Sequence, residues 1–229
     1  MTSIPIEKRN QPWPAEILDH PQFIASLAKW YRPNLFVEYG SANGDCTRVY
    51  APFCKKVYGV DMTRQPLFAI PNLIFHKMST REFKTSVLDK LTEPIDMAFI
   101  DADHKAEVAF QDFEDLFTHT IENGIIFLHD TFPCEAKWAD PIFSGDSWKV
   151  PYMIKEKYGN VCDVFTIPIQ PGLTMVRKYT KPLSHMVYTK SDTTKQIIKS
   201  DYESDSNRDT ITKAYGLYVG PFEPQKYGT

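Results

Sequence analysis

The sequence predicts an α/β fold: a mostly parallel sheet with helices on both faces and an antiparallel hairpin at its carboxyl end. Up to Asp130, short apolar runs alternate with segments of helical periodicity. Strands that alternate with helices are typical of a parallel sheet. Farther on, two β-rich segments, residues 161–169 and 173–178, are joined by Gln170-Pro171-Gly172. That composition favours a hairpin turn.

The individual elements follow from length, periodicity and the positions of proline and glycine. The clearest helix covers residues 105–121, where apolar side chains recur at three- and four-residue spacing, and Asn123-Gly124 is expected to close it. Pro52 is expected to end an earlier helix. The expected helices are residues 21–31, 45–51, 80–91 and 105–121, with another after residue 150. The expected strands are residues 34–38, 56–62, 73–77, 95–100, 125–128, 161–169 and 173–178.

The chain of 229 residues is long enough to bury one full hydrophobic core, and a single domain over residues 23–180 is expected. Residues 1–22 are rich in proline and predict an extended lead-in. Residues 181–229 are largely polar, and we expect a tail that is partly disordered or ordered only against a partner. A homo-oligomer formed through this C-terminal arm is one possibility that the sequence leaves open.

Composition and charge restrict the class of protein. The chain is 42% hydrophobic and 24% charged. No run approaches the roughly 18 apolar residues of a membrane span. Its start lacks the apolar core of a signal peptide, so a cytoplasmic protein with no membrane partner is expected. The net charge of −3 and the absence of a basic run make a nucleic-acid partner unlikely. The four widely spaced cysteines are interpreted as buried, reduced thiols.

A glycine-containing turn follows the first expected strand. Gly40 and Gly44 are spaced as GxxxG, which differs from the GxGxxG of dinucleotide-binding folds. Glycine allows a tight turn and a close approach of a ligand to the backbone. Glu38, two residues earlier, suits a ligand with a cationic amino or sulfonium group. The alternative is that these glycines serve only the strand–turn–helix connection.

An acidic residue, Asp61, ends the second expected strand about 20 positions after the glycine turn. A carboxylate placed there can accept both hydroxyls of a ribose. The alternative role for Asp61 is to cap a helix.

Together, Glu38-x-Gly40-x-x-x-Gly44 and Asp61 resemble the first two motifs of class I S-adenosylmethionine (SAM)-dependent methyltransferases. The resemblance covers about residues 20–180. It implies a Rossmann-like sheet of seven strands with a terminal antiparallel hairpin, and SAM as the cofactor. By the same resemblance, Met62 would pack on the adenine of SAM, and Ser79 or Thr80 would lie near its edge. The implied cofactor-binding residues are Glu38, Gly40, Ser41, Gly44, Asp61, Met62, Ser79, Asp101 and Asp103.

Two acidic residues, Asp101 and Asp130, follow the fourth and fifth expected strands. Neighbouring ends of parallel strands meet in one crevice, so these two carboxylates are expected to face each other. They would repel unless a proton or a cation lies between them. Oxygen ligands of this kind suit Mg²⁺, or alternatively Mn²⁺ or Ca²⁺.

The segment Ile100-Asp101-Ala102-Asp103-His104 resembles the fourth-strand signature of cation-dependent O-methyltransferases, both the catechol type and the antibiotic- and sugar-modifying type. That resemblance implies Asp101 and Asp130 as metal ligands and His104 as the base. The fifth strand ends in His129-Asp130-Thr131, which departs from the family pattern, so His129 and Thr131 are both candidates for a third ligand. The alternative is that Asp101 and Asp103 cap the following helix.

These observations predict a SAM-dependent, divalent-metal-dependent O-methyltransferase, whose partner is a small molecule with a hydroxyl group: a sugar, a glycoside or a phenol. Trp138 or Trp148 could border its acceptor pocket or serve as core or lid. A metal-independent enzyme that methylates nitrogen or a carboxylate is the first alternative. A non-catalytic binding module with the same fold is the second. A nucleic-acid methyltransferase is disfavoured because the Asn/Asp-Pro-Pro-aromatic motif is absent.

Overall fold

A computed structural model describes residues 19–133, 136–169 and 171–179 of the chain. Most of the expected lead-in, Cys134 and the expected C-terminal tail lie outside the described residues. No helix in the described part of the chain is long and apolar enough to cross a membrane.

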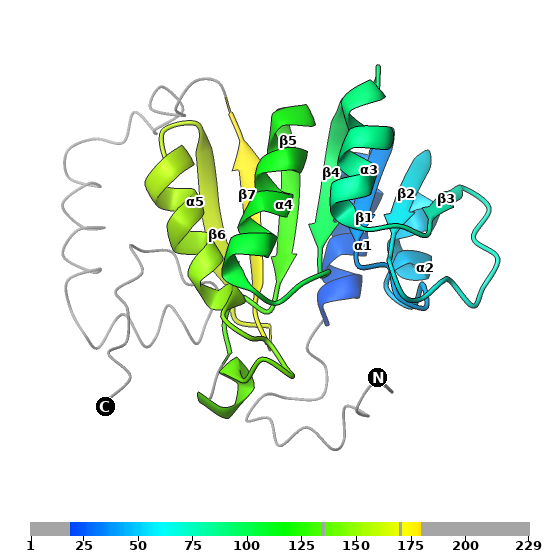
Figure 1. The fold of residues 1–229 in the computed structure, drawn as a ribbon. Helices are drawn as coiled ribbons and strands as arrows, with labels where there is room; N and C mark the ends of the chain where they lie inside the picture. Colours follow the sequence, from blue (N-terminus) through cyan, green and yellow to red (C-terminus); the bar gives the residue numbers. More distant parts are fainter. Residues whose placement is uncertain (1–18, 134–135, 170, 180–229) are drawn as a thin grey trace.

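The structure confirms the expected α/β fold. Seven strands form one sheet in the order β3-β2-β1-β4-β5-β7-β6 (Figure 1). Strand β7 runs antiparallel to both of its neighbours, and the other neighbouring pairs are parallel. The strands are β1 (Leu35–Tyr39), β2 (Lys56–Val60), β3 (Leu73–His76), β4 (Ile95–Ile100), β5 (Thr120–His129), β6 (Cys162–Ile167) and β7 (Leu173–Lys178).

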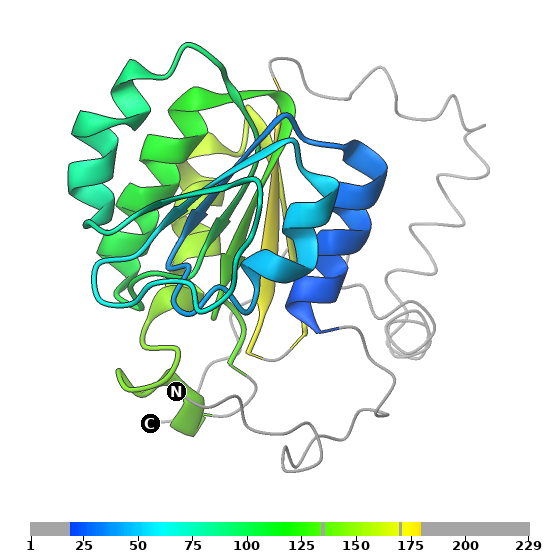
Figure 2. The same cartoon turned by 90° about the vertical axis from the view of Figure 1, so that its right-hand side faces the viewer.

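Helices cover both faces of the sheet, as Figure 2 shows with the sheet seen between the two layers. One face carries α1 (His20–Tyr31) and α2 (Thr47–Tyr50), and α2 continues into a 3-10 turn. The other face carries α3 (Thr80–Ser86), α4 (Ala106–His119) and α5 (Val150–Tyr158).

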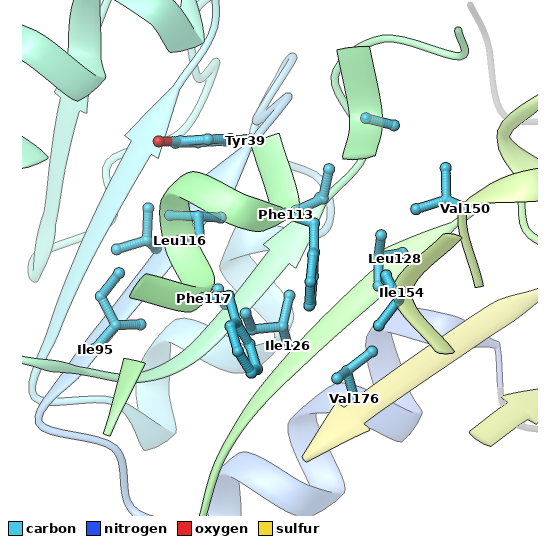
Figure 3. Packing of buried hydrophobic residues seen from close by; sticks show 14 of the residues in the cluster. Tyr39, Ile95, Phe113, Leu116, Phe117, Ile126, Leu128, Val150, Ile154 and Val176 are labelled. Carbon is cyan, nitrogen blue, oxygen red and sulfur yellow. The ribbon is translucent and has the colours of Figure 1, made fainter. Parts of the chain in front are cut away.

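The larger core cluster lies between the sheet and the layer of α3, α4 and α5 (Figure 3). Helix α4 contributes the fully buried Phe113 and Leu116 to it. They face Ile126 of β5 and Val176 of β7, while Ile154 of α5 closes the cluster on one side. The three- and four-residue spacing of apolar residues seen in the sequence is therefore the buried face of α4.

The largest departure from the expected elements lies between α4 and β5. The helix ends at His119, and the strand begins at once at Thr120, so the expected loop at Asn123-Gly124 lies within β5. The Thr120 hydroxyl donates to the carbonyl of Leu116 (2.8 Å), while the Thr120 backbone is already extended and pairs with Ile95 of β4. Asn123 takes a left-handed backbone conformation with a positive φ. Asparagine tolerates this conformation, so the strand continues through it.

Two expected helices are shorter than predicted and continue as 3-10 turns. The α-helix α2 ends at Tyr50, and Pro52 lies inside the 3-10 turn Ala51–Phe53 that follows it. A new turn needs no N–H donor at that position, so proline is tolerated there. Similarly, α3 ends at Ser86 and is followed by the turn Leu88–Lys90.

The sheet brings the predicted site residues to one edge. Tyr39 at the end of β1 is level with Val60 of β2 and Ile100 of β4, and Ile100 is level with Leu128 of β5. The residues that follow these strand ends therefore lie side by side at the carboxyl edge, where ligands bind in open parallel sheets.

Candidate active site

The glycine turn after β1 packs against the residue that follows β4. Gly40 has a φ of +87°, and its N–H donates to the carbonyl of Val60 (2.8 Å). A Cβ on Gly40 would collide with the backbone carbonyl of Asp101. Only glycine therefore fits this position, for reasons of both backbone conformation and space.

Asp61 fastens the glycine turn to the end of β2. Its Oδ2 accepts the Ala42 N–H (2.9 Å), and its Oδ1 accepts the N–H groups of Thr63 (2.8 Å) and Arg64 (2.7 Å). Asp61 also lines the cleft at the carboxyl edge. Its expected role toward a ribose stays a prediction, and the structure adds a second role in shaping the loop.

Glu38 lies beneath the glycine turn and not among the residues that line the cleft. Its side chain is buried and accepts a hydrogen bond from the Thr47 hydroxyl. Burial raises the pKa of Glu38 to about 7. The expected direct contact of Glu38 with a cationic ligand stays a prediction, and the structure adds a bond between Glu38 and α2. Ser41 is also buried, and neither Ser41 nor Gly44 is among the residues that line the cleft.

A cleft of about 1460 Å³ runs along the carboxyl edge of the sheet. At the β2–β3 end it is bordered by Asp61, by the exposed Met62 and by Ser79. Ser79 caps α3, because its N–H donates to the Glu82 carboxylate (2.9 Å) and its Oγ accepts the Glu82 N–H (3.2 Å). This reciprocal pair is a capping box. The Met62 side chain does not cap a helix in this way, so it is free to pack on the adenine ring as expected.

A group of two carboxylates and one imidazole lies at the β4–β5 end of the same cleft. Single ligand atoms from Asp101, His104 and Asp130 all lie within 4.8 Å of one another. His104 Nε2 is 3.1 Å from Asp130 Oδ2 and 3.7 Å from Asp101 Oδ1. Asp101 and Asp130 therefore lie close together, as expected, and the imidazole of His104 lies between their carboxylates.

His129 contacts the same two carboxylates from the sheet side. Its Nδ1 lies 3.2 Å from Asp101 Oδ1 and 3.4 Å from Asp130 Oδ2. The cluster that could hold a metal ion contains His104 and does not need His129. Thr131, the other expected candidate for a third ligand, is buried, and its hydroxyl accepts a hydrogen bond from Thr174 (2.8 Å).

The electrostatics of this cluster are those of two ion pairs. The hydrogen bond to Asp101 and the charge of Asp130 raise the pKa of His104 to about 9. Burial lowers the pKa of His129, but the two carboxylates outweigh burial and raise it to about 10. Burial likewise raises the pKa of Asp101, and the imidazoles outweigh it and hold that pKa below its usual range. At neutral pH, two imidazolium ions therefore neutralise the two carboxylates.

Asp103 does not cap α4. Its Oδ1 accepts the N–H of Lys105 (2.8 Å), the residue before the helix, whereas the first helical N–H, that of Ala106, donates to Asp146 (2.6 Å). Asp103 borders the cleft, and its expected role toward the cofactor stays a prediction. Asp101 does not cap the helix; the described bonds of its carboxylate are to imidazoles.

Sequence reasoning missed three residues of the site. His20 of α1 borders the cleft, and its ring lies 4.1 Å from that of His129, between ring centroids. Phe143 and Ser144 bond to His104 and Asp130, respectively. No local sequence pattern marks any of the three, because each reaches the site only through packing of a distant segment.

The comparisons with known proteins concern the same part of the chain. Residues 37–131 match the family model of a methyltransferase domain. That range runs from β1 to the end of β5 and includes the glycine turn, Asp61 and the cluster around His104. No curated protein matches the chain.

Several solved structures share the fold. An O-methyltransferase from Bacillus cereus in complex with SAH has a TM-score of 0.56 at 14% identity, over 72% of this chain and 84% of that chain. The O-methyltransferase TomG from Streptomyces achromogenes, in complex with SAM, has a TM-score of 0.53 at 14% identity, over 69% and 79%. An rRNA methylase from Streptococcus thermophilus has a TM-score of 0.53 at 16% identity, over 72% and 99%.

The fold with its terminal antiparallel hairpin is that of class I methyltransferases, and the matched domain covers every residue of the predicted cofactor site. Residues 37–131 therefore resemble a methyltransferase domain, and the chain shares its fold with SAM- and SAH-bound methyltransferases.

Proposed function

We propose that this protein is a SAM-dependent methyltransferase that transfers the methyl group of SAM to a hydroxyl of a small molecule (a sugar, a glycoside or a phenol) and requires a divalent cation. The observation that carries the proposal is the cluster of Asp101, His104 and Asp130, within 4.8 Å of one another in the cleft that Asp61 and Met62 also border. Because structures of this fold include both O-methyltransferases and an rRNA methylase, the fold does not select the acceptor. The site residues must do so.

The chemistry of the cluster fits a divalent cation. Asp101 and Asp130 offer hard oxygen ligands, and the imidazoles of His104 and His129 contact both carboxylates. Oxygen ligands alone suit Mg²⁺, whereas an imidazole beside them suits Mn²⁺ or another transition metal. Mg²⁺ is therefore favoured if His104 acts as the base, Mn²⁺ is favoured if His104 binds the cation, and Ca²⁺ is a third candidate.

Different residues of the cleft would serve the cofactor, the cation and the acceptor. Asp61 and Met62 would hold the adenosine part of SAM, and Asp101 and Asp130 would hold the cation, so that an acceptor hydroxyl bound there would lie near the sulfonium methyl. A bound divalent cation lowers the pKa of a hydroxyl that it contacts. Nε2 of His104 faces the same two carboxylates, so the neutral imidazole would be placed to take the hydroxyl proton. The acceptor oxygen then bonds to the methyl carbon as the carbon–sulfur bond breaks.

His104 could alternatively bind the cation through Nε2, and a nitrogen that does so cannot also accept the proton. The variant His104→Gln separates these roles. A base role predicts cation affinity equal to or higher than that of wild type, because the competing charge of His104 is removed, and loss of methyl transfer by about a hundredfold or more. A ligand role predicts that both are lost together.

The pH dependence of cation binding should follow the imidazoles. Since the pKa of His104 is raised to about 9 and that of His129 to about 10, both are protonated at neutral pH and compete with a cation. Cation affinity is therefore expected to rise with pH between 6.5 and 8.5, by about tenfold per pH unit for each proton displaced. Calorimetric Mn²⁺ titrations at pH 6.5, 7.5 and 8.5 measure this slope. An affinity independent of pH would contradict the displacement of protons.

The first test of the function is calorimetric titration of the full chain with SAM, followed by Mn²⁺ and Mg²⁺. Micromolar binding of SAM and of a cation supports the proposal and justifies a screen of hydroxylated acceptors with and without EDTA. Binding of SAM without a cation favours the metal-independent alternative, in which nitrogen or a carboxylate is methylated. Failure to bind SAM would favour the non-catalytic binding module.

A further inference from the structure

The connection between β5 and α5 forms the wall of the cleft next to the carboxylate cluster. Trp138, Ile142 and Phe143 all border the cleft there, and Ile142 and Phe143 are 69% and 43% exposed. The rings of Trp138 and Phe143 meet edge to face, with 5.0 Å between their centroids. We call residues 138–146 the wall segment. Its apolar side chains are a surface on which the body of an acceptor can rest.

The wall segment is bonded directly to the cluster. The Ser144 hydroxyl donates to Asp130 Oδ1 (2.7 Å), and His104 Nδ1 is hydrogen-bonded to the backbone carbonyl of Phe143. The backbone N–H of Asp146 donates to the carbonyl of His104 (3.0 Å), and the Asp146 carboxylate accepts the N–H of Ala106 (2.6 Å) at the start of α4.

These bonds determine which atoms the cluster presents to the cleft. Because Ser144 occupies Asp130 Oδ1, the other oxygen, Oδ2, is the one that faces the imidazoles. Because the Phe143 carbonyl can only accept a hydrogen bond, Nδ1 of His104 must carry the proton, and Nε2 faces the carboxylates. Partners of this kind fix the orientation and the basicity of groups that bind a metal.

We infer that Ser144 is a positioning residue for Asp130 and that the wall segment couples the acceptor-binding surface to the cation site. This inference rests on the proposed function. The side chain of Phe143 borders the cleft, and its carbonyl is hydrogen-bonded to His104. Ser144, the next residue, is hydrogen-bonded to Asp130. A shift of Asp130 or His104 would therefore move the wall segment as well. By linkage, an acceptor that rests on the wall strengthens cation binding by the same factor as the cation strengthens acceptor binding.

The test compares Ser144→Ala with Ser147→Ala in the full chain. Ser147 is also buried in the same connection, and among the described residues its hydroxyl has no bond to Asp130. Calorimetric titration with Mn²⁺ is expected to show about tenfold weaker binding for Ser144→Ala and unchanged binding for Ser147→Ala. Thermal unfolding without metal shows that both variants fold. Equal Mn²⁺ affinity of wild type and Ser144→Ala would overturn the positioning role while leaving the cation site intact. Failure of wild type to bind Mn²⁺ would instead overturn the proposed function.

A second measurement needs no change at the cluster. Mg²⁺ is titrated into the wild-type chain and into Trp138→Phe while tryptophan fluorescence is recorded. The chain has four tryptophans, and coupling predicts a saturable change in wild type that is lost in Trp138→Phe, although calorimetry shows Mg²⁺ still bound. A change of the same size in both proteins would contradict the coupling of the wall to the cluster.

Discussion

Replacement of Gly40 by alanine is expected to abolish SAM binding and to lower the free energy of unfolding by more than about 3 kcal/mol. Gly40 has a φ of +87°. A positive φ of this kind alone costs a residue with a side chain roughly 1–2 kcal/mol. The new Cβ would also meet the backbone carbonyl of Asp101, which cannot rotate away as a flexible side chain can. The glycine turn must then move away from the end of β4, and the cleft loses its shape between Asp61 and Asp101.

Gly44→Ala is the matched control. Gly44 has a similar φ of +81°, but its added Cβ would meet only the side chains of Pro66 and Ile70 and the Pro66 Cα, at 3.1 Å or more. It should therefore lose roughly 1–2 kcal/mol and retain measurable SAM binding. Urea unfolding gives the free energies, and SAM calorimetry gives the affinities. Equal losses in both variants would show that backbone strain alone governs the turn.

The sequence predicted most of the fold because the apolar pattern and the turn residues act locally. The strand Ile95–Ile100 and the hairpin of β6 and β7 were predicted to within two residues. The boundary of α4 was wrong because it depends on the pairing of Thr120 with Ile95, which lies on a different strand and before the helix in the chain. Pairing across such a separation leaves no periodic signal in the sequence.

In the candidate site too, the features that depend on local sequence were predicted and those that depend on distant packing were not. Asp101 and Asp130 could be placed together because each directly follows a strand of a parallel sheet, and their meeting required only the strand order. The burial of Glu38 and its hydrogen bond with Thr47 depend on how α2 packs on β1. The contact of Ser144 with Asp130 depends on the path of the wall segment, which has no regular periodicity.

The substitutions Asp101→Asn and Asp130→Asn are expected to reduce Mn²⁺ affinity by at least about a hundredfold and methyl transfer by about a thousandfold, or roughly 4 kcal/mol. Each removes one of the two charges that hold the cation while keeping the size of the side chain. Asparagine is the appropriate replacement at position 130, because Asp130 has a left-handed backbone conformation with a positive φ. Asparagine tolerates that conformation and alanine does not. A variant with alanine would mix backbone strain with the loss of charge.

Asp89→Asn is the matched control for these variants. The Asp89 carboxylate also lies near an imidazole, His119 Nε2, at 3.8 Å, and it accepts a hydrogen bond from Lys84, but it is not among the residues that border the cleft. It should retain the cation affinity of wild type. SAM titrations separate the two ends of the cleft: SAM affinity within a few-fold of wild type in Asp130→Asn is expected, because Asp130 lies at the β4–β5 end and Asp61 at the β2 end. If cation affinity and methyl transfer both survive in Asp101→Asn and Asp130→Asn, the reaction does not pass through this cluster, and the metal-independent mechanism takes its place.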